Sequence, residues 1–415
     1  MHKLWMHLDF SRAQSVISLP AIRACINRSK AMLTHVTFVN ISLPAVDKAL
    51  LYLSRCPNLE CLDIRMPCEG RRIYELFKTS KKLRALIISK DIRLSQKLLI
   101  GFLADLPALE RIESHATTLS PDNIMWPTKL PNLKVIALSS EEVRYLSNQI
   151  PPLHICDNDN VWGLYLFLKE ICVLINPLQV TLYNSIPNLE ELSLCWRSPH
   201  LSRYPFGLTA AGLPSLRRLD LSGMYLTANA DLPPNLEYLR FHNCTIRPSF
   251  PEDPLLKLPN LHSIIFENSA SIALHSLRIL LDASEGALRY FHLDSGISEF
   301  TEIVVEMLAE APASKGLREL ILANMYGLAD SHVCTLLKNM PELRVLHVPY
   351  TGITGCTIKT IAEARLASSK EAEGENPDSF QKRIPNIEQV DIRGCENLSS
   401  DAVDYGRARG IKIIK

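Results

Sequence analysis

The chain has 415 residues, of which 47% are hydrophobic and 21% charged, a composition that argues against an intrinsically disordered protein. Lys and Arg number 45 against 44 Asp and Glu, which argues against nucleic-acid binding through bulk positive charge. A chain of this length either divides into several globular domains or forms a repeat array in which each unit contacts its neighbours.

The first residues, MHKLWMHLDF, have no long apolar core and no small-residue cleavage site, so we expect no signal peptide. The eleven cysteines are an odd number without paired spacing, and we interpret them as reduced thiols. Both observations predict a nuclear and/or cytoplasmic protein. Near the start, Trp5 is expected to cover the open end of the first repeat.

One phrase recurs along the chain, in which a leucine is followed by two variable residues, an aliphatic, one variable residue and a second aliphatic. Pro57–Ile64, Pro187–Leu194 and Pro234–Phe241 are clear copies, and each opens with Pro-Asn. Most copies are about 20 to 29 residues apart, which is the period of leucine-rich repeats. The thirteen copies begin at Leu33, Leu59, Leu83, Leu109, Leu133, Leu189, Leu216, Leu236, Leu261, Leu288, Leu317, Leu343 and Ile387.

The last two aliphatic residues of the phrase are two positions apart, so they point to one face of a short strand and form the core. The variable residues between them point to the opposite, concave surface. Amphipathic stretches between phrases, such as 45–54, 302–309 and 331–338, predict helices on the convex side. We therefore predict an α/β leucine-rich-repeat solenoid, a horseshoe of about 13 to 14 units over 21–415 with parallel strands on its concave face.

Two steps break the period. Between Leu133 and Leu189, the segment 151–183 is a degenerate repeat or an irregular insertion, and its apolar run with Lys169 and Glu170 predicts a buried helix too short to span a membrane. Between Leu343 and Ile387, the composition of 367–383 predicts an exposed, mobile loop. The chain is expected to close with a helix over 401–409 and a strand over 410–414.

The two ends carry the most specific motifs. The final unit, VDIRGCENLSSDAV at 390–403, is similar to the cysteine-containing repeats of F-box proteins. Residues 4–13, LWMHLDFSRA, resemble the closing segment of an F-box, with Trp5 and Leu8 at its motif positions. The carboxyl-terminal DAVDYGRARGIKI is similar to the end of fungal proteins that combine tetratricopeptide repeats, an F-box and leucine-rich repeats. The chain thus resembles fungal F-box/leucine-rich-repeat proteins, loosely over its whole length.

This resemblance implies a substrate-recognition subunit of an SCF-type ubiquitin ligase, which binds a target protein through its concave face. Only a residual F-box exit segment, 1–20, is present, so a Skp1-type adaptor is expected as a partner only if a fuller F-box lies upstream. Two alternatives stay open: a free-standing interaction scaffold without a ligase link, and a regulator of a GTPase or another enzyme.

Motifs for nucleotide binding, nucleophilic serine or zinc peptidase chemistry are absent from the sequence. The pairs His154/Cys156 and His242/Cys244 suggest a metal, but no C-x-x-C accompanies either pair. We expect a protein that is not an enzyme and has no cofactor, no metal and no direct contact with membrane or nucleic acid.

A basic cluster made of Lys78, Lys81, Lys82 and Arg84 is interpreted as a solvated helix terminus, with a phosphate contact as the alternative. The concave surface is the candidate binding site, because Tyr and Arg are enriched at binding hot spots. The alternative is that a solenoid face is polar simply because it faces solvent. The predicted protein-binding residues are Trp196, Arg197, Arg218, Asp220, Tyr238, Arg240, His242, Glu267, Tyr290, His292 and Asp294.

Overall fold

The computed structural model divides into two compact units, which are described separately. The first unit is Met1–Tyr204 with Ala211–Leu216, and the second is Pro205–Ala210 with Arg217–Lys415. The residues that the structure describes are 5–11, 17–39, 41, 43–66, 68, 70–88, 103, 105–114, 130, 132–140, 188–196, 205–206, 213–223, 225–226, 232–246, 250–251, 253, 255–268, 274–294, 300–371 and 386–415.

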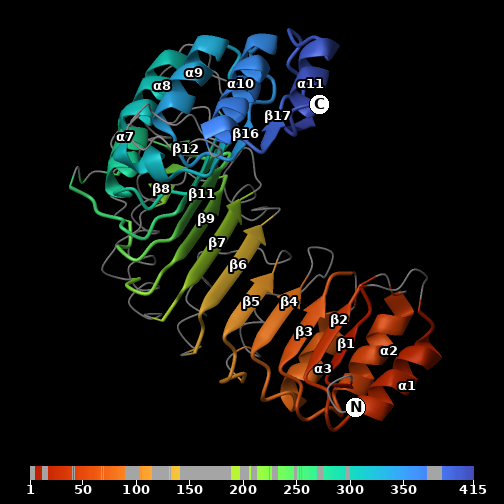
Figure 1. Cartoon of the computed structure of the whole chain (residues 1–415). Coiled ribbons are helices and arrows are strands. Elements are labelled where there is room, and N and C mark those ends of the chain that lie inside the picture. The colour runs from red at the N-terminus through yellow and green to blue at the C-terminus, as the bar shows by residue number, and fades with distance from the viewer. Residues whose placement is uncertain are drawn as a thin grey trace, which may run out of the picture. The chain divides into compact units, whose positions relative to one another are not determined.

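The first unit contains a parallel sheet whose strands pair in chain order. Its helices α1 (Leu19–Ser29), α2 (Leu43–Leu53) and α3 (Gly70–Thr79) lie on one face of this sheet (Figure 1). The strands are β1 (His7–Asp9), β2 (His35–Phe38), β3 (Cys61–Ile64), β4 (Ala85–Ile88), β5 (Arg111–Ser114), β6 (Val135–Ser140) and β7 (Glu191–Trp196).

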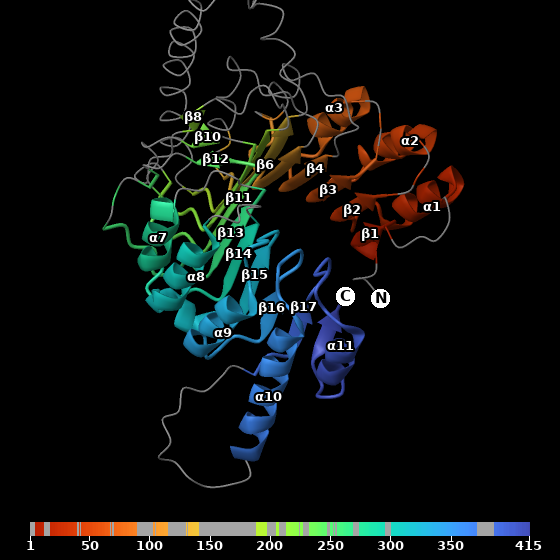
Figure 2. The same ribbon diagram turned by 90° about the horizontal axis from the view of Figure 1, so that it is seen from above.

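The second unit repeats this arrangement, with helices α7 to α10 on one face of a second run of parallel strands (Figure 2). The strands of this run are β9 (Arg218–Ser222), β11 (Tyr238–His242), β13 (Ser263–Glu267), β14 (Tyr290–Asp294), β15 (Glu319–Ala323), β16 (Val345–His347), β17 (Gln389–Asp391) and β18 (Lys412–Ile414). The helices are α7 (Leu274–Ala283), α8 (Thr301–Glu310), the 3-10 helix η5 (Pro312–Gly316), α9 (Asp330–Asn339), α10 (Gly355–Glu371) and α11 (Ser400–Arg407).

The repeat phrase produces this architecture as predicted. Each of the thirteen copies leads into one strand, from β2 after Leu33 to β17 after Ile387. In β11, Leu239 and Phe241 are fully buried while Tyr238, Arg240 and His242 are half-buried, which is the alternation expected of a strand with one core face. The predicted α/β leucine-rich-repeat fold is therefore confirmed.

The two irregular steps do not interrupt the ladder. Strand β6 pairs directly with β7, with Val135 opposite Glu191, so the residues between them contribute no strand in between. The segment 151–183, predicted to be a degenerate repeat or an irregular insertion, lies outside the described residues. At the second step, α10 extends to Glu371, so the predicted loop over 367–383 begins too early. The helix continues past the predicted start of the loop because no strong helix breaker follows Gly355 before Gly374. The end of the predicted loop lies outside the described residues.

The convex side of the second unit differs from the prediction in its first repeats. Short strands β8 (Pro205–Phe206), β10 (Tyr225–Leu226) and β12 (Thr245–Ile246) pair in parallel there, where helices were predicted. For β10 the cause is repeat length, because Leu216 and Leu236 are only 20 residues apart. Repeat length does not explain β8 and β12, whose repeats are about as long as the repeat that contains α3.

Part of the segment 1–20, which was predicted to be an F-box remnant, forms strand β1 of the sheet. Within it, Leu8 is the buried middle residue of β1 and pairs with Val36 of β2. Trp5, in a short helical turn before β1, is half-buried. Leu8 therefore acts as a core residue of the first described repeat.

Candidate protein-binding face

The candidate site is the sheet face of the second unit that is opposite its helices, which we call the open face. It is formed by alternate residues of the parallel strands, and the strand register brings them into rows. One row contains Arg218, Tyr238, Ser263, Tyr290 and Glu319. Its neighbour contains Asp220, Arg240, Ile265, His292, Ile321, His347 and Asp391.

Tyr238 is flanked by a cation from the preceding strand. The guanidinium carbon of Arg218 lies 3.7 Å from the centre of the Tyr238 ring, which is a cation–π contact. Burial raises the pKa of Tyr238 above its ordinary value, with opposing contributions from nearby arginines and carboxylates. The phenol is therefore neutral at physiological pH and presents a hydroxyl and an aromatic edge.

Arg240 is the centre of the predicted cluster. Its Nη2 lies 2.6 Å from Glu267 Oε2, and its Nη1 lies 3.4 Å from Asp220 Oδ2. Burial acts to lower the pKa of Arg240, but the hydrogen bond to Glu267 and the two carboxylate charges outweigh it and raise the pKa. Three predicted residues from three successive repeats are thus held in one ion-pair network.

His292 extends this network by one strand, because its Nδ1 lies 3.4 Å from Glu267 Oε1. Burial lowers the pKa of His292, and the nearby Arg240 and His347 act in the same direction against Glu267 and Asp294. The imidazole is neutral at pH 7, when it accepts or donates one hydrogen bond without charge.

A second network, which the sequence analysis missed, lies on strands β15 to β17. His347 contacts Asp391 Oδ2 at 3.2 Å and Glu319 Oε1 at 3.6 Å. The Asp391 side chain is fully buried, and burial alone would raise its pKa. Hydrogen bonds from Arg393 and His347 outweigh that effect and lower the pKa. Applying the repeat register to the later phrases would have identified these positions.

Two isoleucines interrupt the row that contains Arg240. Ile265 is 7% exposed and lies between Arg240 and His292, while Ile321 is half-buried between His292 and His347. The open face therefore combines charged, aromatic and apolar contact area, as protein-binding surfaces do.

Exposed tyrosines also lie beyond the ends of β15 and β16. Tyr326 is 64% exposed and Tyr350 is 51% exposed. Tyr350 has a φ of 56°, and the corresponding position after other strands is Gly223, Asn243, Asn268, Asn324 or Gly394, all with positive φ. Tyrosine is less suited to this conformation than glycine or asparagine, and no sequence pattern predicted it here.

Other predicted residues take separate places. Asp294 accepts a hydrogen bond from Asn324 Nδ2 at 2.8 Å, and His242 Nδ1 lies 3.0 Å from Ser222 Oγ. Trp196 ends β7 in the first unit, and Arg197 lies outside the described residues.

The other predicted clusters do not form sites in the described residues. Cys244 contacts the Leu221 carbonyl at 3.3 Å and His242 contacts Ser222, so this His-x-Cys pair does not converge on a metal position; His154 and Cys156 lie outside the described residues. Among the described residues, no group of His, Cys, Asp and Glu could hold a metal ion, and no helix is long and apolar enough to cross a membrane.

The basic cluster connects neighbouring repeats. Lys82 Nζ donates to Asn58 Oδ1 at 2.7 Å, and Arg84 Nη2 lies 2.6 Å from Glu110 Oε1. Lys81 Nζ donates to the Asp105 carbonyl at 3.1 Å. These contacts favour the structural interpretation over a phosphate site.

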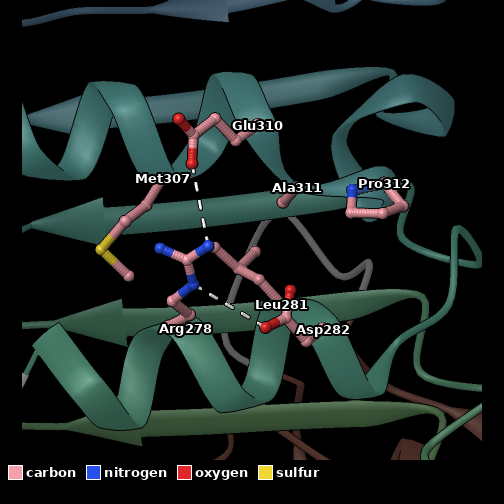
Figure 3. Close-up of a pocket in the computed structure, with 7 residues that line it drawn as sticks. All are labelled: Arg278, Leu281, Asp282, Met307, Glu310, Ala311 and Pro312. Atoms are coloured by element: carbon pink, nitrogen blue, oxygen red, sulfur yellow. Dashed lines mark ion pairs between the residues drawn. The ribbon is translucent and has the colours of Figure 1, made fainter.

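A small cavity lies between α7 and α8 (Figure 3). It has a volume of about 90 Å³, and Arg278 crosses it to reach Glu310 at 3.7 Å and Asp282 at 3.9 Å. Ligand pockets usually have volumes of about 300 Å³ or more, so this cavity is too small for an organic ligand of ordinary size.

Comparisons with known proteins add similarity in structure only. No protein-family model matches the chain, and a search of curated proteins finds no match. Among solved structures, the chain is similar to one in the crystal structure of the yeast Rad7 and Elc1 complex, with 15% identity and a TM-score of 0.49 over 96% of this chain and 88% of that one. It is also similar to an internalin (inlF) from Listeria monocytogenes, with 16% identity and a TM-score of 0.41 over 78% of this chain and 76% of that one.

Proposed function

We propose that the protein is a recognition scaffold that binds a partner protein through the open face of its second unit. The observation that carries this proposal is the pair of neighbouring rows of side chains from successive repeats, in which Tyr238, Arg240 and Tyr290 lie near ion-paired carboxylates. Tyr and Arg contribute most of the binding energy in many protein interfaces. Ion pairs with Glu267 and Asp220 hold Arg240 in place before the partner binds, which reduces the ordering cost of binding.

The double variant Tyr238→Ala with Tyr290→Ala is expected to weaken partner binding at least tenfold, because both rings belong to the contact surface. The partner is first isolated from extracts of the native source on the immobilised chain, and its affinity is then measured with purified components. The matched control is Tyr405→Ala on α11, which removes a tyrosine that also stacks with an arginine, at 3.7 Å from Arg409. Unchanged affinity in a folded double variant, as judged by circular dichroism, would refute this assignment.

We further propose that the bound partner is a substrate of an SCF-type ubiquitin ligase, for which this chain is the receptor. The support is the likeness of residues 4–13 and 390–415 to F-box/leucine-rich-repeat proteins. Alternative roles are a free-standing scaffold and a regulator of a GTPase or another enzyme.

The ligase proposal is tested with the product of the full coding region, extended upstream of Met1 if the reading frame continues. This product is expected to co-purify with a Skp1-type adaptor in equimolar amount. Absence of the adaptor, while the partner of the open face is retained, would reject the ligase role and favour the free-standing scaffold.

A further inference from the structure

The two tyrosines of the open face differ in what lies beside them. Tyr238 has Arg218 on the preceding strand, and that guanidinium stacks on its ring. Tyr290 has Ser263 on the preceding strand and Glu319 on the following one. Serine is too short to cover a ring, and among the described residues no cation stacks on Tyr290. The cation–π contact that Arg218 makes with Tyr238 therefore has no equivalent at Tyr290 among the described residues.

Two carboxylates, those of Glu319 and Glu267, lie near Tyr290. The side chain of Glu319 is 37% exposed and lies 3.6 Å from His347, an imidazole that is charged only when protonated. Burial first, and then Glu319 and Glu267, raise the pKa of Tyr290 to about 12, in agreement with a negative environment around the ring.

The nearby arginines are directed elsewhere. Arg240 is already bound to Glu267 and Asp220. Arg289, which precedes Tyr290 in the chain, donates to the carbonyls of Gly286 and Gly316 at 2.9 and 3.3 Å. Arg318 is exposed and directly precedes β15, outside the row that contains Tyr290.

We propose that Tyr290 and Glu319 together receive an arginine side chain from a basic segment of the partner protein. The guanidinium stacks on the Tyr290 ring, as Arg218 does on Tyr238, and its N–H groups donate to the Glu319 carboxylate. A planar guanidinium suits this arrangement better than an ammonium, because it can stack and form an ion pair at the same time. This inference rests on the proposed function of the open face and specifies the chemistry of the partner.

The probe is a fluorescently labelled peptide, Gly-Arg-Gly-Arg-Gly, titrated into the whole chain at low ionic strength, where ion pairs are least screened. We expect saturable binding that falls at least fivefold when citrulline replaces arginine, because citrulline keeps the shape and removes the charge. Glu319→Lys is expected to weaken binding at least tenfold. The matched control, Glu306→Lys, makes the same charge change on the exposed surface of α8 and is expected to leave affinity within twofold.

Equal binding of the arginine and citrulline peptides, or equal affinity of Glu319→Lys and the wild-type chain, would overturn the proposal. If Gly-Glu-Gly-Glu-Gly binds more tightly than Gly-Arg-Gly-Arg-Gly, the proposal is also overturned. That result would indicate that arginines at the starts of the strands bind the partner. A second variant, Tyr290→Leu, tests the same site independently, so the test still holds if Glu319→Lys does not fold. It is also expected to weaken binding. If the arginine peptide fails while the Tyr238/Tyr290 double variant still loses the natural partner, this inference fails and the proposed function stands.

Discussion

Replacing Phe241 with alanine is expected to lower the free energy of unfolding of the second unit by about 3 to 5 kcal/mol. Phe241 is fully buried on the core side of β11. Its ring centre lies 5.5 Å from that of Phe266 in the next repeat and 5.8 Å from that of Phe250. Removing the ring leaves a cavity that neighbouring repeats cannot easily fill, because the spacing of the parallel strands is fixed by their backbone hydrogen bonds.

The measurement is urea unfolding followed by circular dichroism, with Tyr326→Ala as the control. Tyr326 is 64% exposed, so its loss is expected to change stability by less than about 0.5 kcal/mol. A change below about 1 kcal/mol for Phe241→Ala would show that the stacked phenylalanines do not form a tightly packed core.

The second large effect is expected at Asp330, the first residue of α9. Its carboxylate crosses to the next repeat and accepts hydrogen bonds at the start of α10, from Thr354 N at 2.9 Å and Thr357 N at 3.1 Å. The hydroxyls of the same threonines donate to it at 2.6 and 2.5 Å. A carboxylate at this place satisfies backbone N–H groups and complements the helix dipole, so Asp330→Ala is expected to cost about 2 to 3 kcal/mol.

The control for this variant is Asp404→Ala on α11, where a carboxylate with 74% side-chain exposure has only a loose contact with Arg407. Its removal should change the unfolding free energy by about 0.5 kcal/mol or less. Equal losses for the two variants would contradict the capping role of Asp330.

The contribution of Asp330 depends on pH in a direction that follows from its pKa. Burial acts to raise the pKa, but the hydrogen bonds from Thr354 and Thr357 outweigh it, and the folded-state pKa is lowered from 3.8. The folded state therefore binds this proton less readily than the unfolded chain does. The stability difference between the wild type and Asp330→Asn should be full above about pH 5 and shrink as the pH falls below 4. A difference that stays constant down to pH 3 would exclude a charged cap.

The strands could be predicted from sequence because each repeat phrase contains its own signal. The polar contacts could be predicted less well. Asp330 and Thr354 are in different repeats, and nothing near either residue indicates that one caps the helix of the other. The network of Glu319, His347 and Asp391 likewise depends on register across three strands. Pairwise contacts between repeats are set by the folded ladder, and a single phrase does not contain them.

Burial of polar residues was also difficult to predict. The pattern assigns Asp63 to a solvent-facing position, yet the residue is 5% exposed, because Arg65 folds over it with its Nε 3.0 Å from the carboxylate. In β13, three consecutive apolar residues hide the alternation of faces, so the sequence does not show that Ile265 lies on the open face. Alternation gives the face of a side chain, whereas its exposure depends on how long its neighbours are.

The direct pairing of β6 with β7 has a consequence for how this protein can change in evolution. Strand β6 ends at Ser140 and the neighbouring strand β7 begins at Glu191. Because the two strands pair directly, their positions in the sheet do not depend on the number of residues between them. Doubling the length of a segment that joins two fixed ends costs only about 0.6 kcal/mol in closure entropy. New sequence can therefore be acquired, lengthened or lost at this junction while the repeats on either side keep their register.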